Sequence, residues 1–296
     1  MRAISAAVVL MAYGSPDRLE DVPAYYADIR GSRPVRQELL DDLVARYRRL
    51  GIEDRNPLNE ITERTRASLQ AELGVPVFTG MKHWRPRIAD AVETALAGGA
   101  ETVVGLVLAP HYSRLSIGGY RAQLEKALAG RAELLFVESW HDEPGLVRFW
   151  ADRLRGSQAH VVFTAHSLPA RVRDEGDPYE AQLLETAELV ANAAGLRDWS
   201  FSFQSESPTG EPWLGPDILD HLEALRALGV EHALLAPIGF VADHLEIRWD
   251  LDTEARGKAD GLGIDLRRVE MPNDDPAFVG VLAGLVRRAL AVRSTA

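Results

Sequence analysis

The sequence predicts an α/β protein made of two similar halves, each built on a parallel sheet. One observation is a repeat: residues 8–16 read VVLMAYGSP and residues 161–169 read VVFTAHSLP, which aligns Tyr13 with His166. The other is the alternation of short apolar, β-branched runs with segments of helical period along the 296-residue chain. Such alternation is typical of doubly wound parallel sheets.

A second repeat supports the duplication. One copy runs through Trp84, Pro86, Ile88 and Asp90 to Leu108-Ala109-Pro110, and the other runs through Trp213, Pro216, Ile218 and Asp220 to Leu235-Ala236-Pro237. In both copies a helix-like stretch ends at a glycine, and an apolar run follows. Each half is therefore expected to have the same order of elements.

Eight segments are predicted to be strands, because each is short, apolar and rich in β-branched residues. They are residues 6–11, 76–79, 102–108 and 134–138 in the first half and 160–164, 199–204, 232–236 and 266–269 in the second. The N-terminal apolar run superficially suggests a signal peptide. Because its Val-Val core recurs at residues 161–162, we interpret it as the first buried strand instead.

Amphipathic segments between the strands predict the helices, at residues 36–50, 61–73, 87–97, 117–129, 178–194 and 217–227. Pro144 begins a further helix, through residue 155, that should link the halves. We expect a last helix at 276–292 to pack back on the first half. The predicted domains are residues 1–142, 143–270 and the C-terminal helix at 271–296.

Composition excludes several classes of protein. A net charge of −11 and a pI of about 5.3 argue against a nucleic-acid partner. The absence of cysteine excludes disulfides, a thiol nucleophile, Cys-ligated zinc and an iron–sulfur cluster. No apolar run reaches the roughly 18 to 20 residues that a membrane span needs. The expectation is a cytoplasmic monomer.

The candidate site lies where the predicted strands end, since ligands of open α/β sheets bind outside the carboxyl ends of the strands. Those ends carry Tyr13, His111 and His166, and no glycine-rich phosphate loop follows any of them. His166 has two interpretations: a satisfied core histidine, or an imidazole that binds a metal or accepts a proton.

The segment 243–254 is dense in carboxylates. If it is helical, Glu246, Asp250 and Glu254 fall at i, i+4 and i+8 on one stripe. That stripe is either a solvated acidic face or a path for a hard cation. One His and one Glu without cysteine would make an open, weak metal site, which suits a metal in transit.

Arginines and tyrosines crowd the segment after the first strand. Arg30, and Arg46 with Tyr47, can bind ligand carboxylates beside a flat apolar group, because guanidinium forks pair with carboxylates.

Motifs along essentially the whole chain resemble the ferrochelatase family, whose members insert ferrous iron into a porphyrin. They are LMAYGSP, RYRRLGIEDRNPLNEIT, GMKHWRP, LAPHYSRLSIGGY, ESWHDEP, FTAHSLP, GDPY, FQSESP, PWLGPD and APIGFVADHLEIRWDLDTE. The combination of AHSLP, GDPY, PWLGPD and DHLE is highly specific. The resemblance implies two Rossmann-like, chelatase-type halves with a porphyrin cleft between them.

The resemblance also implies roles for residues. His166 and Glu246 correspond to the pair that binds the metal and removes pyrrole protons, and Asp250 and Glu254 continue a line of carboxylates that serves as a metal path or Mg²⁺ site. Tyr13 resembles the axial ligand of product iron in the coproporphyrin III branch. Positions that contact the porphyrin or its propionates are Arg30, Arg46, Tyr47, Tyr120 and Asn56, where Asn56 stands in place of the usual Ser.

The expected activity is therefore a lyase of haem biosynthesis that inserts Fe²⁺ into coproporphyrin III. Fe²⁺ is a substrate, no cofactor is held permanently, and the next haem-pathway enzyme is a transient partner. Three alternatives stay open: insertion into protoporphyrin IX, a non-catalytic porphyrin- or haem-binding protein, and another chelatase that inserts cobalt or nickel. A two-lobed transport-type binding protein shares the architecture, but it would be expected to carry an export signal.

Overall fold

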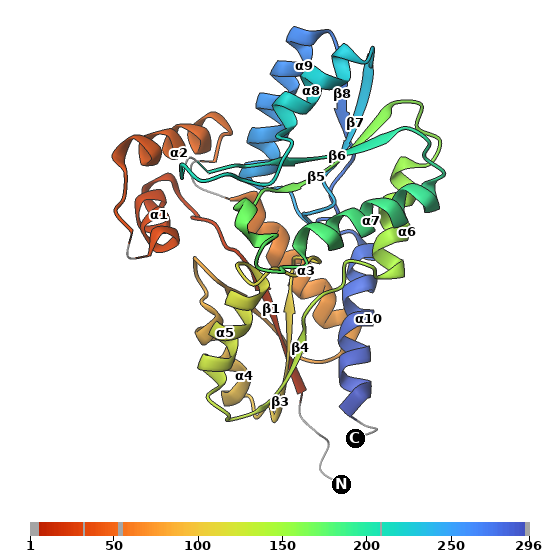
Figure 1. Ribbon diagram of the computed structural model, residues 1–296. Helices are drawn as coiled ribbons and strands as arrows, with labels where there is room; N and C mark the ends of the chain where they lie inside the picture. The colour runs from red at the N-terminus through yellow and green to blue at the C-terminus, as the bar shows by residue number, and fades with distance from the viewer. Residues whose placement is uncertain (1–5, 32, 53–55, 208, 294–296) are drawn as a thin grey trace. The chain divides into compact units, whose positions relative to one another are not determined.

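The computed structural model in Figure 1 describes residues 6–31, 33–52, 56–207 and 209–293. The chain divides into two compact units. Unit 1 comprises residues 1–109, 114–139 and 273–296, and unit 2 comprises residues 110–113 and 140–272. The short segment 110–113 groups with unit 2, and the C-terminal helix groups with unit 1.

The sheet of unit 1 contains four parallel strands in the order β2-β1-β3-β4. They are β1 (Ala6–Ala12), β2 (Val77–Met81), β3 (Thr102–Val107) and β4 (Glu133–Val137). Every residue of β3, and every residue of β1 after Ala6, is buried. Near-continuous burial is the expected property of parallel strands covered on both faces.

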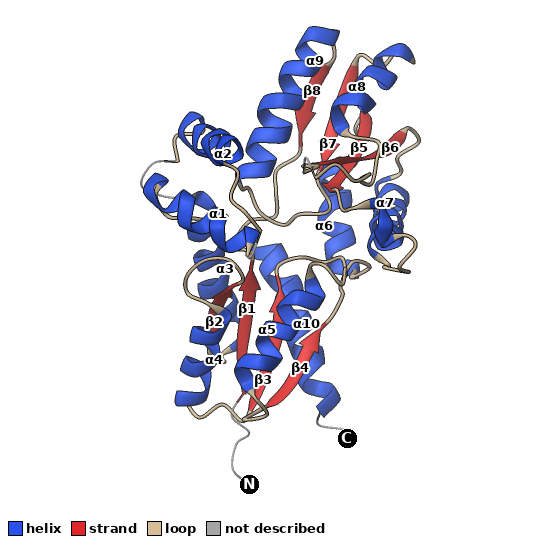
Figure 2. Cartoon of the chain, turned by 60° about the vertical axis from the view of Figure 1, so that its left-hand side comes forward, coloured by secondary structure: helices blue, strands red, loops and turns tan. Residues whose placement is uncertain are grey.

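Helices cover both faces of this sheet (Figures 1 and 2). On one face, α3 (Pro57–Leu73) packs against α10 (Pro276–Arg293), and α10 also contacts β3 and β4. On the other face, α4 (Ile88–Ala97) packs against α5 (Ile117–Leu128). Two further helices, α1 (Val22–Arg30) and α2 (Gln37–Arg49), contact each other and follow the short 3₁₀ turn η1 (Leu19–Asp21).

Unit 2 repeats the arrangement, with strand order β6-β5-β7-β8. Its strands are β5 (His160–His166), β6 (Trp199–Gln204), β7 (His232–Ala236) and β8 (Asp265–Arg268). Helices α6 (Pro144–Leu154) and α7 (Tyr179–Ala194) pack together, as do α8 (Ile218–Ala227) and α9 (Arg256–Leu262). The remaining elements are the 3₁₀ turn η2 (Ala170–Val172) and the π-helix η3 (Ile247–Ala255).

The duplication predicted from the sequence extends to hydrogen bonds. The backbone N–H of Met81 donates to the Pro86 carbonyl at 2.7 Å, and the N–H of Phe203 donates to the Pro216 carbonyl at 2.8 Å. In both units the first strand lies between the second and the third. The chain therefore leaves the first strand toward one side of the sheet and the second strand toward the other, and the two connections diverge at the carboxyl end of the first strand. That divergence is where an open α/β sheet leaves room for a ligand.

In the part of the chain that the structure describes, no helix combines the length and apolar character that crossing a membrane requires.

Candidate functional site

His166 is the last residue of β5, the strand flanked by β6 and β7. Its Nδ1 donates to the carbonyl of Ser167, and its own carbonyl accepts from the Tyr179 hydroxyl at 3.0 Å. The next residue is fixed as well, because the Ser167 N–H donates to Gln204 O at 2.8 Å and its hydroxyl donates to Leu214 O at 2.7 Å. The imidazole is therefore held with Nε2 as its outward nitrogen.

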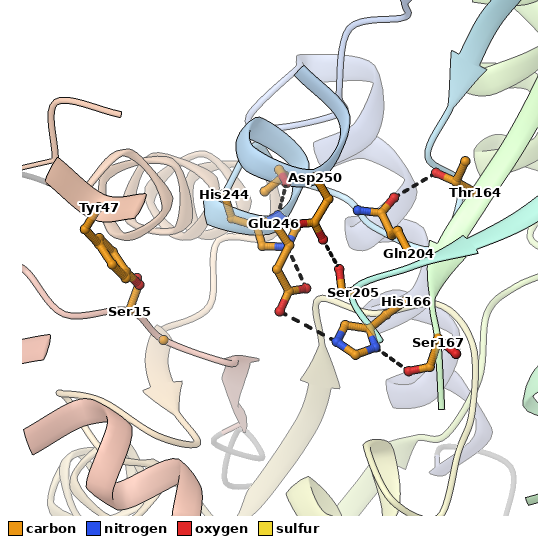
Figure 3. Close-up of polar contacts among 12 residues, drawn as sticks. Ser15, Tyr47, Thr164, His166, Ser167, Gln204, Ser205, His244, Glu246 and Asp250 are labelled. Carbon is orange, nitrogen blue, oxygen red and sulfur yellow. Dashed lines mark hydrogen bonds and ion pairs between the residues drawn. The ribbon is translucent and has the colours of Figure 1, made fainter. Parts of the chain in front are cut away.

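Glu246 directly precedes η3 and brings its carboxylate to that nitrogen (Figure 3). Glu246 Oε1 lies 3.6 Å from His166 Nε2, and Oε2 lies 3.6 Å from His244 Nε2. His244 is itself oriented, since its Nδ1 donates to Ala242 O at 2.9 Å. The side chains of His166 and Glu246 remain 32% and 38% exposed, so a small ion has access to both.

The two groups shift each other's protonation. Burial lowers the pKa of His166, but the Glu246 carboxylate outweighs burial and raises that pKa to about 9. Burial likewise raises the pKa of Glu246, while the charge and hydrogen bonds of His166 and His244 hold it well below its usual range. At neutral pH the two side chains are thus an imidazolium–carboxylate pair.

The acidic stripe differs from the expected α-helical arrangement, because residues 247–255 form a π-helix with wider i→i+5 turns. Asp250 is only 8% exposed and accepts a hydrogen bond from the Ser205 hydroxyl, whereas Glu254 is exposed. Among the described residues, no three His, Asp or Glu side chains are grouped so that they could hold a metal ion. Within the described residues, His166 and Glu246 are thus an imidazole and a carboxylate that lie together, and Asp250 is occupied by Ser205.

Unit 1 carries the residues that sequence analysis assigned to the porphyrin. Tyr13 directly follows β1 and is 43% exposed, and its ring lies 4.6 Å from the ring of His83. Tyr120, on α5, is buried under Lys82, whose Nζ lies 4.9 Å from the centre of the Tyr120 ring. Burial raises the pKa of the Tyr120 phenol well above its ordinary value, so this phenol stays protonated.

The two arginines and Tyr47 belong to α1 and α2. Arg30 ends α1, and its Nε is buried without a hydrogen-bond partner among the described residues. Arg46 pairs with Asp42 at 2.8 Å. The Tyr47 hydroxyl lies 2.8 Å from Ser15 Oγ and is buried (Figure 3).

Asn56 has a structural role that the sequence did not indicate. It is the N-cap of α3, where its Oδ1 accepts from the Leu58 N–H at 3.1 Å. Its Nδ2 donates to Ser15 Oγ at 2.7 Å and to Pro16 O at 3.0 Å, and the residue is only 4% exposed. Because both amide protons are engaged, this geometry leaves no donor on Asn56 for a porphyrin carboxylate.

A group of three polar side chains, His83, Asp28 and Arg87, lies at the end of β2 and had no predicted role. His83 Nδ1 lies 2.9 Å from Asp28 Oδ2, and Arg87 binds the same carboxylate through both of its terminal nitrogens. Lys82 and His83 lie at a predicted strand end, which is the signal that could have identified them. Asp28 lies on α1, a helix that was not predicted, and no motif in the sequence links it to Lys82 and His83.

Comparisons with known proteins identify the family of this chain. The family model described as Ferrochelatase matches residues 5–290. A protein of Herpetosiphon aurantiacus named ferrochelatase is 44% identical, with 95% of this chain and 97% of the relative covered. The coproporphyrin III ferrochelatases of Halalkalibacterium halodurans and Bacillus subtilis are 41% and 38% identical, with 96% of this chain and 97% of each relative covered.

Among solved structures, SirB from Bacillus subtilis with Fe³⁺ superposes with a TM-score of 0.65 over 98% of both chains. Its 11% identity makes this a likeness of fold alone. The match to the family model and to relatives over nearly the whole length leads to one conclusion. The chain belongs to the ferrochelatase family of metal chelatases, lyases of haem biosynthesis that use Fe²⁺ as a substrate.

Proposed function

We propose that this ferrochelatase inserts Fe²⁺ into coproporphyrin III, with His166 and Glu246 as the residues that receive the metal. The observation that carries the metal site is the pair itself: one imidazole and one carboxylate, 3.6 Å apart and both about one-third exposed. The choice of porphyrin is supported by relatives at 41% and 38% identity that are named coproporphyrin III ferrochelatases.

The charge state of the pair suits a metal in transit. Fe²⁺ binds only as the Nε2 proton of His166 leaves, because a metal needs the free Nε2 lone pair. Two protein ligands leave the remaining coordination positions to water and then to pyrrole nitrogen. A three- or four-ligand site would hold the iron too tightly to release it to the ring.

Proton balance then follows from the same two residues. Insertion releases two pyrrole protons for each Fe²⁺ that enters. Once the iron has moved to the ring, His166 is again a free imidazole beside a carboxylate, with a pKa of about 9. It is therefore a suitable acceptor for one of these protons, which restores the ion pair for the next cycle, and the second proton passes to solvent.

Unit 1 contributes the porphyrin contacts in this proposal. Tyr13 provides an exposed phenol as axial ligand of the product iron, and Arg30 and Arg46 provide guanidinium groups for the four carboxylates of the substrate. Tyr47 and Tyr120, both buried, act as supports rather than as donors. Energy from binding the porphyrin rim distorts the ring and exposes a nitrogen lone pair to the metal.

The first experiment is anaerobic insertion of Fe²⁺ into coproporphyrin III and protoporphyrin IX in parallel, followed by absorbance. Faster turnover of coproporphyrin III supports the proposal, and a preference for protoporphyrin IX replaces it with formation of protohaem. Insertion into neither porphyrin overturns both. His166→Ala should slow insertion by at least about 100-fold, the loss expected for a proton acceptor, while porphyrin binding persists.

A matched control comes from the opposite end of the same sheet. His232 begins β7 and its side chain is 68% exposed, so His232→Ala should insert iron at the wild-type rate. Full activity of His166→Ala would contradict the assignment of the metal-receiving pair.

A further inference from the structure

The ends of β1 and β2 in unit 1 carry a chain of contacts that the proposed reaction does not use. The backbone N–H of His83 donates to the carbonyl of Tyr13 at 3.0 Å. The two side-chain rings lie 4.6 Å apart at an angle of 50°. His83 therefore contacts Tyr13 twice, by a backbone hydrogen bond and by packing of the two rings.

The far side of the His83 ring is held by Asp28. His83 Nδ1 and Asp28 Oδ2 are 2.9 Å apart. A carboxylate only accepts hydrogen bonds, so Nδ1 carries the proton.

Asp28 is in turn fixed by Arg87. Arg87 Nη2 donates to Oδ1 at 2.8 Å and Nη1 donates to Oδ2 at 3.1 Å, a two-point contact with geometric specificity. The same Nη1 donates to the Lys82 carbonyl at 3.2 Å, which connects the ion pair to the end of β2. The side chains of Asp28 and Arg87 are only 31% and 39% exposed, so this pair is better shielded than an ordinary surface pair.

Packing places Asp28 where it can do this. Tyr25 and Ile29, on α1 with Asp28, form an apolar cluster with Met81 and Trp84. The Tyr25 hydroxyl donates to the Gly14 carbonyl at 3.0 Å. A side chain at Gly14 would not fit, since its φ is +84° and a Cβ would lie 2.9 Å from Trp84 Cβ.

We propose that Asp28 is a positioning residue for Tyr13. Held by Arg87, Asp28 fixes the tautomer and orientation of His83, and the His83 ring keeps Tyr13 oriented to ligate the iron of the product. The inference rests on the proposed role of Tyr13 and deepens it, because it extends the product-binding site from one exposed phenol to a chain of four residues. Partners behind a metal-binding group commonly set its orientation in this way.

The test uses the full chain and ferric coproporphyrin III, the stable oxidised form of the proposed product, added as the preformed complex. Asp28→Asn removes the charge that holds Arg87 and lets the His83 tautomer exchange. We expect its absorption spectrum to move toward that of Tyr13→Phe. The Kd for the complex should rise by about tenfold, the lower end of the loss seen when such outer partners are removed.

Glu93→Gln is the matched control. Glu93 also makes a two-point contact with an arginine of unit 1, Arg131, but both side chains are about half exposed and neither contacts Tyr13. Its spectrum and Kd should equal those of the wild type. Arg87→Gln keeps the Asp28 charge and should shift the spectrum in the same direction as Asp28→Asn, which provides a second test if Asp28→Asn folds poorly.

A readout without porphyrin tests the tautomer directly. The ¹⁵N resonances of the His83 ring, assigned by their loss in His83→Gln, should show a protonated Nδ1 in the wild type and a changed tautomer population in Asp28→Asn. Wild-type spectra, Kd values and ring resonances in both Asp28→Asn and Arg87→Gln would overturn the inference. A Tyr13→Phe spectrum identical to the wild type would overturn it together with the role of Tyr13. Failure of the wild type to insert iron would instead overturn the proposed function.

Discussion

At the scale of single residues, a proton and an iron ion compete for the same two side chains. Without iron, His166 and Glu246 form an ion pair. Glu246 raises the pKa of His166, His166 lowers the pKa of Glu246, and each therefore stabilises the charged form of the other. In the proposed reaction this competition is useful, because the energy of re-forming the ion pair helps to expel the metal toward the ring. It also limits how tightly the pair can hold iron at neutral pH.

His111 shows the opposite electrostatic case. It is 3% exposed, its Nε2 lies 2.9 Å from the Thr186 hydroxyl, and burial with the nearby His141 lowers its pKa to about 3. The folded state therefore binds fewer protons at His111 than the unfolded state between pH 3 and pH 6.5. Its contribution to stability falls as the pH falls through this range.

We predict that the His111→Gln variant loses less stability on acidification than the wild type. From pH 6.5 to pH 5 the difference between the two free energies of unfolding should change by about 2 kcal/mol in favour of the variant, since each pH unit is worth about 1.4 kcal/mol. Urea unfolding at a series of pH values measures it. Parallel curves for the two proteins would show that His111 titrates normally in the folded state.

At the scale of elements, the register of β5 beside the loop after β7 leaves no room for a side chain at Gly239. The N–H of Gly239 donates to the Thr164 carbonyl at 3.1 Å. A Cβ there would lie 2.4 Å from Ala165 Cβ and 2.8 Å from Ala165 Cα. Since Ala165 precedes His166, any shift that relieves this clash also moves the metal-receiving residue.

Gly239→Ala should therefore destabilise the protein by about 1 to 3 kcal/mol, the usual cost of overpacking, and slow iron insertion as well. Gly257→Ala is the control, because Gly257 lies in α9 and a Cβ added there would meet no atom of the described residues within 4 Å. It should stabilise the protein by up to about 1 kcal/mol, the helix preference of Ala over Gly. Denaturant unfolding compares the two. If the unfolding midpoint of Gly239→Ala equalled that of the wild type, the loop after β7 would be able to move away from β5 at little cost in free energy.

The sequence was informative about elements whose pattern is local. All eight strands lie where short apolar runs predicted them, with ends that differ by at most two residues. Two helices were not predicted: α1, in which Pro23 and two tyrosines mask the helical period, and the short α9. The π-helix was not foreseen either, since i→i+5 bonding leaves no distinct spacing in the sequence.

In the candidate site, too, the residues with a local sequence signal could be predicted and the others could not. A strand end identified His166, but the motif resemblance was needed to select Glu246 from several carboxylates in the same segment. Ser15, which Asn56 contacts, and His83, which Asp28 contacts, lie 41 and 55 residues away in the chain, so only the folded structure could reveal these two contacts.

At the scale of the whole molecule, unit 1 is assembled from distant segments. Phe278, on α10, is fully buried, and two ion pairs hold the C-terminal segment to α3: Arg64 with Asp274 and Arg287 with Glu72. The same helix also packs on β3 and β4, so it closes one face of the sheet of unit 1. The stability of unit 1 should therefore depend on its last helix.

We predict that Phe278→Ala weakens unit 1 selectively, by about 3 to 5 kcal/mol as for other large core truncations. Amide hydrogen exchange should show lost protection in β1 to β4 and unchanged protection in β5 to β8. Val292→Ala, at a position of the same helix that is 69% exposed, should leave both sets unchanged. Equal loss of protection in both sheets would mean that the two units open as one cooperative body.

The division of unit 1 has a consequence for its biosynthesis. A ribosome completes β4 at Val137 but reaches the end of α10 only at Arg293. At about 5 to 20 residues per second, the strands that α10 covers wait roughly ten to thirty seconds for it. Residues 140–272, which make up nearly all of unit 2, are synthesised within that interval. The half whose synthesis begins first is thus also the half whose synthesis is completed last, and chaperones that shield apolar strands are expected to act on its nascent sheet.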